Sequence, residues 1–330
     1  MTKRERIAAA LARAPVDRTP IAFWRHVPEV DHRAKGLADA MLAFHHRWDI
    51  DLIKVMSSGV YCVEDWGCKV AYQGAPSGAK QCTDHAVKTT ADWARIRPLD
   101  PGAGALGREL EAVRLIARGR GDDAPLLHTI FSPLTIARKL AGERLHADLR
   151  TSPAAVVPAL EAIAASVERY ALASLEAGAD GVFFATQTAS PETVTESESA
   201  EYDLAYARRA LEAVRGRSFL TLLHLHGATP YFDRWSALPV HAVNWHDRVT
   251  TPTLAEARAR GDRALVGGLN ERRTLRESAS QAVAAEVADA VRQTGGTGLI
   301  LAPGCVLPLD VPDEALGAAT AAARKPLTQE

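Results

Sequence analysis

The chain lacks the features that would place it in a membrane or in a disulfide-bonded secreted fold. No apolar run in its 330 residues approaches the roughly 20 needed to cross a bilayer. The opening stretch, MTKRERIAAALARAP, is charged and has no long apolar segment, so it does not resemble a signal peptide. Four cysteines are too few for a disulfide framework. We therefore expect a soluble, cytoplasmic protein with reduced thiols.

An excess of charge of one sign is also missing. The net charge is −1 and no basic stripe occurs, which argues against nucleic acid or a membrane surface as a partner. The motifs of a phosphate-binding loop and of a serine-nucleophile elbow are absent. One formal dinucleotide motif, GAGALG, follows Pro98 and Pro101 instead of a buried strand. We interpret it as a flexible lead into a helix.

Apolar sequence is abundant, at 47% of residues, and forms short runs that alternate with longer helical patterns. Most of these runs contain consecutive apolar residues, as parallel strands buried on both faces do. Eight strands are predicted, at residues 20–26, 51–56, 125–131, 180–186, 219–227, 240–246, 264–270 and 298–305. With helices between most of them, they predict an α/β fold, a single (β/α)₈ TIM barrel over residues 1–330.

The segments between the strands show helix signals and one long insertion. An N-terminal helix is predicted at 2–14, with Thr2 as its cap and Pro15 as its stop. Further helices are predicted at 154–178, 204–216 and 277–296. The gap after the second strand, about 57–124, is unusually long. We expect an elaborated loop there, with a small hairpin over the mouth of the barrel.

Histidine and cysteine gather at the carboxyl ends of the predicted strands, where barrel enzymes carry their active sites. His224 and His226 end the fifth strand, and because alternate residues of a strand point the same way, both imidazoles can face one ion. Cys305 ends the eighth strand. Two imidazoles and a thiolate are good zinc ligands and leave a fourth position open. The alternative is a hydrogen-bonded core histidine and a small buried thiol.

Polar residues end the first, second and fourth predicted strands as well. Arg25 suits recognition of a carboxylate through its planar guanidinium, although a surface salt bridge is the competing interpretation. Together with His26 it would anchor an anionic part of a substrate. His26 is also a candidate catalytic proton donor. Ser58 and Gln187 are candidate substrate contacts at the ends of their strands.

The stretch NWHDR ends the sixth predicted strand with several reactive side chains. Asn244 and His246 would share one face of the strand and line the floor of the site. His246 is a candidate catalytic proton carrier. Asp247 would contact the substrate or orient a partner, although capping of a strand-to-helix turn suits this residue too.

Several stretches resemble the uroporphyrinogen decarboxylase superfamily, namely APVDRTPIAFW, EAGADGVFFAT, LVGGLNERRTL and LAPGCVLPLDVPDEAL. The resemblance covers nearly the whole chain and follows the same strand order. It implies a (β/α)₈ barrel with a deep cleft at the carboxyl ends of its strands. One branch of the superfamily decarboxylates uroporphyrinogen without a cofactor. Another consists of zinc-dependent methyltransferases that work with cobamides and thiols.

The chain departs from the decarboxylase branch at that branch's catalytic motifs. The Arg-Gln-Ala-Gly-Arg motif after the first strand corresponds to FWRHVPEVD, in which only Arg25 matches an arginine. Ser58 replaces the aspartate of a Phe-Ser-Asp motif, and a serine has no negative charge to stabilise a protonated pyrrole. Cys305 stands in place of the histidine of a Gly-His-Gly stretch. These differences argue against uroporphyrinogen decarboxylation.

The methyltransferase branch agrees better with the chain. Its His-x-Cys motif on strand five corresponds to HLHG, so His224 matches and His226 replaces a cysteine. Its Gly-Cys motif on strand eight matches Cys305. The resemblance implies zinc on these three residues. With one thiolate instead of two, we expect the ion to be a stronger Lewis acid and to hold a substrate thiolate more tightly.

The preferred hypothesis is a zinc-dependent methyltransferase that moves a methyl group between a corrinoid or other methyl donor and a zinc-bound thiol. The resemblance implies a corrinoid protein and a second copy of the chain as partners. The alternative is a cofactor-free decarboxylase of uroporphyrinogen or another small carboxylic acid. A metal-dependent hydrolase is more distant, because there the His-x-His normally ends the first strand. A non-enzymatic protein that binds a tetrapyrrole or corrinoid is the remaining class.

Overall fold

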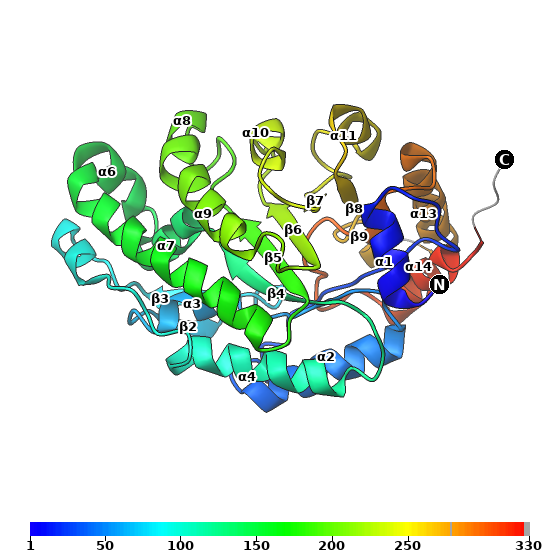
Figure 1. Cartoon of the computed structure of the whole chain (residues 1–330), viewed down its shortest axis with the longest axis horizontal. Coiled ribbons are helices and arrows are strands. Elements are labelled where there is room, and N and C mark those ends of the chain that lie inside the picture. The colour runs from blue at the N-terminus through cyan, green and yellow to red at the C-terminus, as the bar shows by residue number, and fades with distance from the viewer. Residues whose placement is uncertain (278, 327–330) are drawn as a thin grey trace.

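The computed structural model describes residues 1–277 and 279–326. Its centre is a parallel sheet of seven strands, which Figure 1 shows in the middle of the molecule with helices around the outside. In sheet order the strands are β1 (Ile53–Lys54), β4 (Leu126–Phe131), β5 (Gly181–Thr186), β6 (Leu220–Leu225), β7 (Ala242–Asn244), β8 (Ala264–Leu269) and β9 (Leu299–Pro303). All of their residues are buried, which accounts for their consecutive apolar residues.

The eighth position of the barrel is filled by an extended segment around Ile21 instead of a regular strand. Ile21 forms a parallel bridge with Leu301 of β9. On the other side, the Ile21 carbonyl accepts a 2.8 Å hydrogen bond from the amide of Asp51, just before β1. Pro20 has no N–H to extend this pairing. The predicted barrel is therefore confirmed, but the strand predicted at 20–26 is reduced to one bridge.

Helices lie between most of the strands, as predicted, and the four helices predicted by residue range are present with shifted ends. They are α1 (Lys3–Leu11), α2 (Ala34–Trp48), α3 (Tyr61–Glu64), α4 (Gly104–Gly119), α5 (Pro133–Ala141), α6 (Arg144–Thr151), α7 (Pro153–Glu176), α8 (Glu196–Ser199), α9 (Ala205–Val214), α10 (Phe232–Ser236), α11 (Leu254–Arg260), α12 (Thr274–Glu277), α13 (Ser280–Thr294) and α14 (Asp313–Ala323). A 3₁₀ turn (Thr90–Arg95) and a π turn (Ala200–Leu204) complete them. Residue 278 of the helix predicted at 277–296 lies outside the described residues.

The N-terminal helix has the predicted cap and an earlier end. The Thr2 hydroxyl accepts a hydrogen bond from the Glu5 amide, and the Glu5 carboxylate accepts one from the Thr2 amide. This reciprocal pair satisfies two amides that a helix start leaves without partners. The helix ends at Leu11 because the backbone turns left-handed at Arg13, with φ of 56°, before it reaches Pro15.

The long insertion contains the predicted hairpin, made of β2 (Lys69–Tyr72) and β3 (Lys80–Asp84). The hairpin turn packs on the barrel, where the Leu309 amide donates a 2.8 Å hydrogen bond to the Pro76 carbonyl. The interpretation of GAGALG as a flexible lead was wrong, because α4 already begins at Gly104. The Asp65 carboxylate accepts hydrogen bonds from the first amides of this helix, at Ala105 and Leu106, and so fixes its start.

One continuous apolar core joins the barrel to the insertion. The helix pair α2 and α4 lies along one side of the sheet, at the bottom of Figure 1. Across the residues with a described placement, we find no helix long and apolar enough to cross a membrane.

Candidate functional site

A cavity of about 330 Å³ opens at the carboxyl ends of the strands. Its floor comes from the barrel, with Trp24, Lys54, Phe183 and the three candidate metal ligands. Its wall comes from the hairpin, through Ser77, Ala79 and Lys80. The insertion therefore covers part of the barrel mouth, as predicted. The volume lies at the lower end of the roughly 300–1,000 Å³ found for small-molecule sites.

His224, His226 and Cys305 converge on this cavity. Their candidate ligand atoms all lie within 4.8 Å of one another. Cys305 Sγ is 3.8 Å from His226 Nδ1 and 4.0 Å from His224 Nε2. Around a tetrahedral zinc ion, bonds of about 2.3 Å to sulfur and 2.0–2.1 Å to nitrogen would separate such atoms by about 3.6 Å. Small side-chain movements would thus bring this set onto one ion.

Asn244 sets the protonation of His224. Asn244 Nδ2 donates to the carbonyls of Val266, at 2.8 Å, and Pro303, at 3.2 Å. The amide oxygen therefore points to His224 Nδ1, 2.6 Å away, and accepts its proton. The lone pair of this imidazole is then on Nε2, the nitrogen that faces Cys305. A histidine oriented in this way by a hydrogen bond on its other nitrogen is typical of metal ligands.

The charges around Cys305 favour its ligand form. Burial alone would raise the pKa of the thiol, but its contacts with His224, His226 and His246 hold the pKa well below its usual value. Burial likewise opposes the charge on His246, yet its contacts with Cys305 and Glu271 raise its pKa to about 9. His246 Nε2 lies 3.3 Å from His226 Nδ1. Thiolate is the form of cysteine that binds metals.

Four cations line the cavity, and none of the described lining residues is acidic. Lys80 pairs with Asp31, Arg272 contacts Glu271, and the amine of Lys139 donates to Gln187. Lys54 is different, because its amine donates a hydrogen bond to the sulfur of Met56, at 2.9 Å. None of these four residues was predicted from the sequence. The signal that could have found Lys54 is a lysine inside the apolar run DLIKVM.

Lys54 is a buried cation without a carboxylate partner in the part of the chain that the structure describes. Burial lowers the pKa of its amine to about 7. The amine lies 4.4 Å from the centre of the Phe183 ring and 5.8 Å from that of Trp24. Two ring faces offset part of the desolvation cost, and a bound anion would offset more.

Two predicted substrate contacts do not face the cavity. Arg25 lies between Trp24 and His26 in an extended segment, so its side chain points the other way and donates to the Val311 carbonyl at 2.8 Å. Ser58 is buried and its hydroxyl accepts from the Val60 amide at 3.4 Å. Neither belongs to the described cavity lining. The positions of these two side chains do not support the predicted contacts with a substrate.

Asn244 and Asp247 have structural partners instead of cavity contacts. Asn244 is fully buried and holds His224, as described above. The Asp247 carboxylate accepts from the Gly268 amide of the neighbouring strand β8, at 3.1 Å to each oxygen, and so does not cap a strand-to-helix turn through this bond. Burial raises its pKa to about 7.

His26 and Gln187 do line the cavity. His26 is an uncharged imidazole, because burial first and Lys54 next lower its pKa to about 3. Its Nδ1 is buried and has no hydrogen-bond partner among the described residues. It therefore offers a hydrogen bond to a ligand and no positive charge. Gln187 receives a hydrogen bond from Lys139 at 2.8 Å, which leaves its amide nitrogen free to donate.

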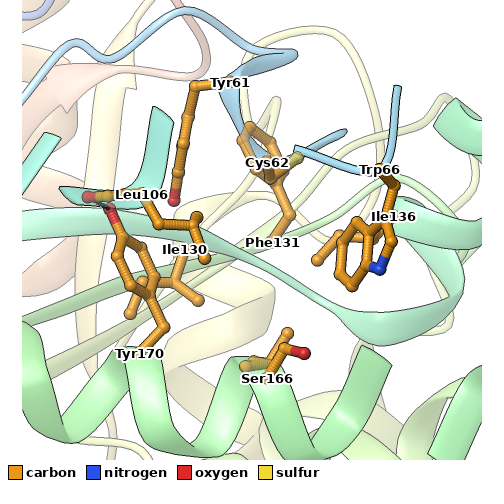
Figure 2. Close-up of a pocket in the computed structure, with 10 residues that line it drawn as sticks. Tyr61, Cys62, Trp66, Leu106, Ile130, Phe131, Ile136, Ser166 and Tyr170 are labelled. Carbon is orange, nitrogen blue, oxygen red and sulfur yellow. Dashed lines mark hydrogen bonds between the residues drawn. The ribbon is translucent and has the colours of Figure 1, made fainter. Parts of the chain in front are cut away.

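Two further cavities lie near this site. One of about 300 Å³ shares His226 and Gln187 with the first cavity and is otherwise lined by Arg138 of α5 and by the loops after β5 and β6. The other, of about 20 Å³, is enclosed by apolar side chains such as Tyr61, Phe131 and Tyr170 (Figure 2). Its volume holds about one water molecule, so it is a packing defect and not a substrate site.

A parallel α/β barrel with a polar cavity at the carboxyl ends of its strands has the architecture of barrel enzymes. The family described as uroporphyrinogen decarboxylase (URO-D) matches residues 2–326. The chain belongs to this family, as the resemblance in its sequence predicted.

Relatives with assigned activities include both methyltransferases and decarboxylases. The chain is 27% identical to the methylcobamide:CoM methyltransferase MtbA of Methanosarcina mazei, over 69% of this chain and 71% of that protein. It is 26% identical to the uroporphyrinogen decarboxylase of Roseiflexus sp. (strain RS-1), over 64% and 65% of the two chains. Both kinds of relative catalyse reactions, so the comparisons support an enzyme.

Among solved structures, a methyltransferase from Methanosarcina mazei has a TM-score of 0.86 and 22% identity, with 98% of each chain covered. A B12-independent methionine synthase from Shewanella sp. W3-18-1 has a TM-score of 0.55 and 13% identity, with 94% of each chain covered. At these identities the likeness concerns the fold, and it agrees with the barrel described above.

Proposed function

We propose that this chain is a zinc-dependent methyltransferase that moves a methyl group between a corrinoid or other methyl donor and a thiol. The observation that carries the proposal is the convergence of His224, His226 and Cys305 beside a cavity, with Asn244 directing the His224 lone pair toward the sulfur. Similarity to MtbA supports the same reaction class.

The three residues fit zinc by ligand type and by protonation. Two imidazoles and one thiolate leave a position open for a substrate. Zinc held there would supply Lewis acidity that favours the thiolate form of a sulfur ligand at neutral pH. Because His226 replaces the cysteine of the related motif, this set carries one negative charge less, and the substrate sulfur is held more strongly.

The rest of the cavity suits an acceptor with an anionic group. Lys54 supplies a buried positive charge, and neutral His26 and the Gln187 amide supply hydrogen bonds. In the reaction the acceptor sulfur forms a bond to the methyl carbon. The donor keeps the electron pair of the bond that breaks, and the thiol proton leaves. The proton passes to solvent, because His246, with its pKa raised to about 9, already carries a proton at neutral pH.

Metal analysis and methyl transfer by the same variants test the proposal. We expect protein purified without a histidine tag to contain zinc and to demethylate methylcobalamin in the presence of 3-mercaptopropionate. Cys305→Ala should lose the zinc of the barrel site and the methyl transfer, whereas His226→Cys should keep the zinc. Cys62→Ala is the matched control, because this buried cysteine lies outside the ligand set. Equal zinc content and equal methyl transfer in wild type and Cys305→Ala would exclude the proposal.

A second candidate is a cofactor-free decarboxylase of a small carboxylic acid, because the cation-lined cavity also suits a carboxylate. His246, whose pKa is raised to about 9, would then deliver the proton that replaces carbon dioxide, because His26, the other residue predicted for this role, is uncharged. A corrinoid protein and a second copy of the chain are proposed as partners only with the methyltransferase. Incubation with uroporphyrinogen separates the two candidates, since formation of coproporphyrinogen would favour the decarboxylase.

A further inference from the structure

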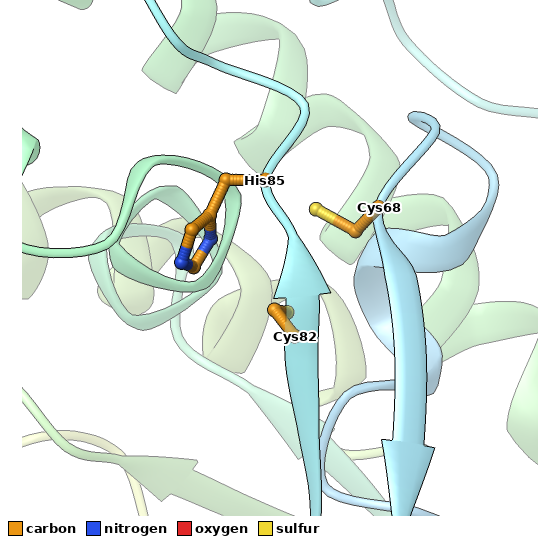
Figure 3. A group of neighbouring side chains, drawn as sticks. All are labelled: Cys68, Cys82 and His85. Carbon is orange, nitrogen blue, oxygen red and sulfur yellow. The ribbon is translucent and has the colours of Figure 1, made fainter.

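A second group of metal-competent side chains lies on the insertion. Cys68 comes just before β2, Cys82 lies within β3, and His85 follows the end of β3 (Figure 3). Each offers one ligand atom, and the three atoms lie within 4.8 Å of one another. Both cysteines are free thiols. The hairpin thus gathers two sulfurs and one imidazole from three separate positions of its backbone.

The surroundings of His85 orient it as metal-bound histidines are oriented. Its Nδ1 lies 2.9 Å from the carbonyl oxygen of Lys139, which can only accept, so Nδ1 carries the proton. The lone pair is then on Nε2. A Cβ atom at Gly142 would come within 3.0 Å of this nitrogen, so the glycine leaves the space beside it free.

The backbone after β3 holds one of the two sulfurs in place. The Ala86 amide lies 3.4 Å from Cys68 Sγ and donates to it. Zinc binds cysteine as the thiolate, so an ion at this pair would release the thiol protons.

The hairpin also needs an additional constraint. It pairs only β2 with β3 and is separate from the seven-stranded sheet. Along β3, half-buried and exposed residues alternate, and none of its five residues is fully buried. An isolated two-stranded hairpin is marginally stable in water, so a link between its strands would contribute much of its order.

We propose that Cys68, Cys82 and His85 bind a Zn²⁺ ion at a second site, which staples the hairpin that forms the cavity wall. Two thiolates and one imidazole are a known type of zinc ligand set, with a fourth position left for water. A cavity of about 250 Å³ lined by His85, Asp84 and Asp92 gives the ion a route from solvent. The inference rests on the hairpin alone and holds whatever reaction the barrel catalyses.

Metal stoichiometry in paired variants tests this site separately from the barrel site. With both sites filled, wild type holds two zinc ions per chain and Cys305→Ala holds one. The double variant Cys82→Ser with Cys305→Ala should hold none. Cys62→Ala should match wild type. If the barrel site does not bind zinc, wild type and Cys305→Ala should both hold one ion. This result would distinguish a failure of the barrel site from a failure of the hairpin site. Equal zinc in Cys305→Ala and in the double variant would overturn the second site.

A measurement on wild-type protein covers the case in which a variant fails to fold. Iodoacetamide labelling of reduced, metal-free protein, read by peptide mass spectrometry, should slow at Cys68 and Cys82 by about tenfold or more when Zn²⁺ is added. Cys62 should label equally with and without the ion. Unchanged labelling of Cys68 and Cys82, or a disulfide between them under reducing conditions, would contradict the proposal.

Discussion

At the scale of single residues, Asn244 controls the chemistry of its neighbour without touching the cavity. Replacing it with alanine removes the acceptor that holds the Nδ1 proton of His224. We expect Asn244→Ala to weaken zinc binding about 10–100-fold, the usual cost of losing such a partner. Competition with a chelator measures this. Asn270→Ala is the control, because this asparagine bonds to the amides of Arg272 and Arg273 instead; an equal loss in both would refute the role.

Lys54 is a second residue whose environment predicts opposite effects on stability and on binding. Lys54→Met removes a buried charge that lacks a carboxylate among the described residues. We expect the free energy of unfolding to rise by on the order of 1–3 kcal/mol. Binding of an anionic thiol should weaken about tenfold or more. Calorimetry with 3-mercaptopropionate and its neutral amide tests the second effect, with exposed Lys69→Met as control.

The pKa of Lys54 also predicts how stability depends on pH. Burial lowers the pKa to about 7 in the folded protein, whereas an unfolded lysine titrates near 10.4. Between these values the unfolded chain binds more protons, so stability rises with pH, by at most about 1.4 kcal/mol per unit. Denaturation of wild type between about pH 7 and 9 should show this slope. Lys54→Met should lose it, and an identical slope in the variant would contradict the assignment.

The alternation of side chains explains which residue roles were predictable. His224, His226 and Cys305 were expected together, since i and i+2 share a face and strand ends share an edge, and the structure brings them together. The same alternation turns Arg25 away and Trp24 and His26 inward. The predicted barrel places β6 beside β7, but the partner of Asn244 depends on the register between them, which pairs it with His224 and which the sequence pattern does not fix.

At the scale of elements, two glycines in the hairpin turn offer a matched test of docking. Gly78 and Gly74 both have positive φ, of 76° and 80°. A Cβ at Gly78 would lie 2.9 Å from His26 Cβ and 3.0 Å from Leu309, whereas at Gly74 nothing lies within 4 Å. Each alanine substitution should cost about 1–2 kcal/mol for the backbone.

Gly78→Ala should cost a further 1–3 kcal/mol, roughly the cost of overpacking, because the hairpin must move off the barrel. Catalytic efficiency should fall in this variant and not in Gly74→Ala, since the hairpin carries Lys80 and Ser77 into the cavity wall. Urea denaturation and initial rates measure the two effects. Equal stabilities of the two variants would show that the turn is not docked.

Element types were more predictable than element ends. Apolar runs located every strand position of the barrel, and helical periodicity located α1, α7, α9 and α13 but not α2. The ends depend on contacts from elsewhere in the chain, as when Asp65 starts α4 inside a motif that looked like a loop. The segment around Ile21 has the composition of a strand, but Pro20 and a single bridge limit its pairing.

At the scale of the whole molecule, one buried carboxylate stabilises the segment that closes the barrel between β9 and β1. Asp51 accepts hydrogen bonds from Arg6 at 2.7 Å, from Arg18 at 2.7 Å and from the Ile21 amide at 2.9 Å. Asp51 therefore connects α1, the extended segment around Ile21 and the residues just before β1. We expect Asp51→Asn to lower the free energy of unfolding by about 3–5 kcal/mol, because two arginines lose their buried partner.

Asp39→Asn is the control, because its 2.7 Å pair with Lys35 is exposed and such pairs contribute at most about 1 kcal/mol. Chemical denaturation of the two variants gives the comparison. Similar losses in both would mean that closure does not depend on Asp51.

The cavities of about 330 and 300 Å³ share part of their lining, which bears on the order in which substrates bind and products leave. His226 and Gln187 line both spaces, so one face of this shared lining is open to each. We expect each space to take one of the two reactants, so that neither must depart before the other arrives. Initial-rate plots for methyl donor and acceptor should intersect, and each product should compete only with the reactant that shares its cavity.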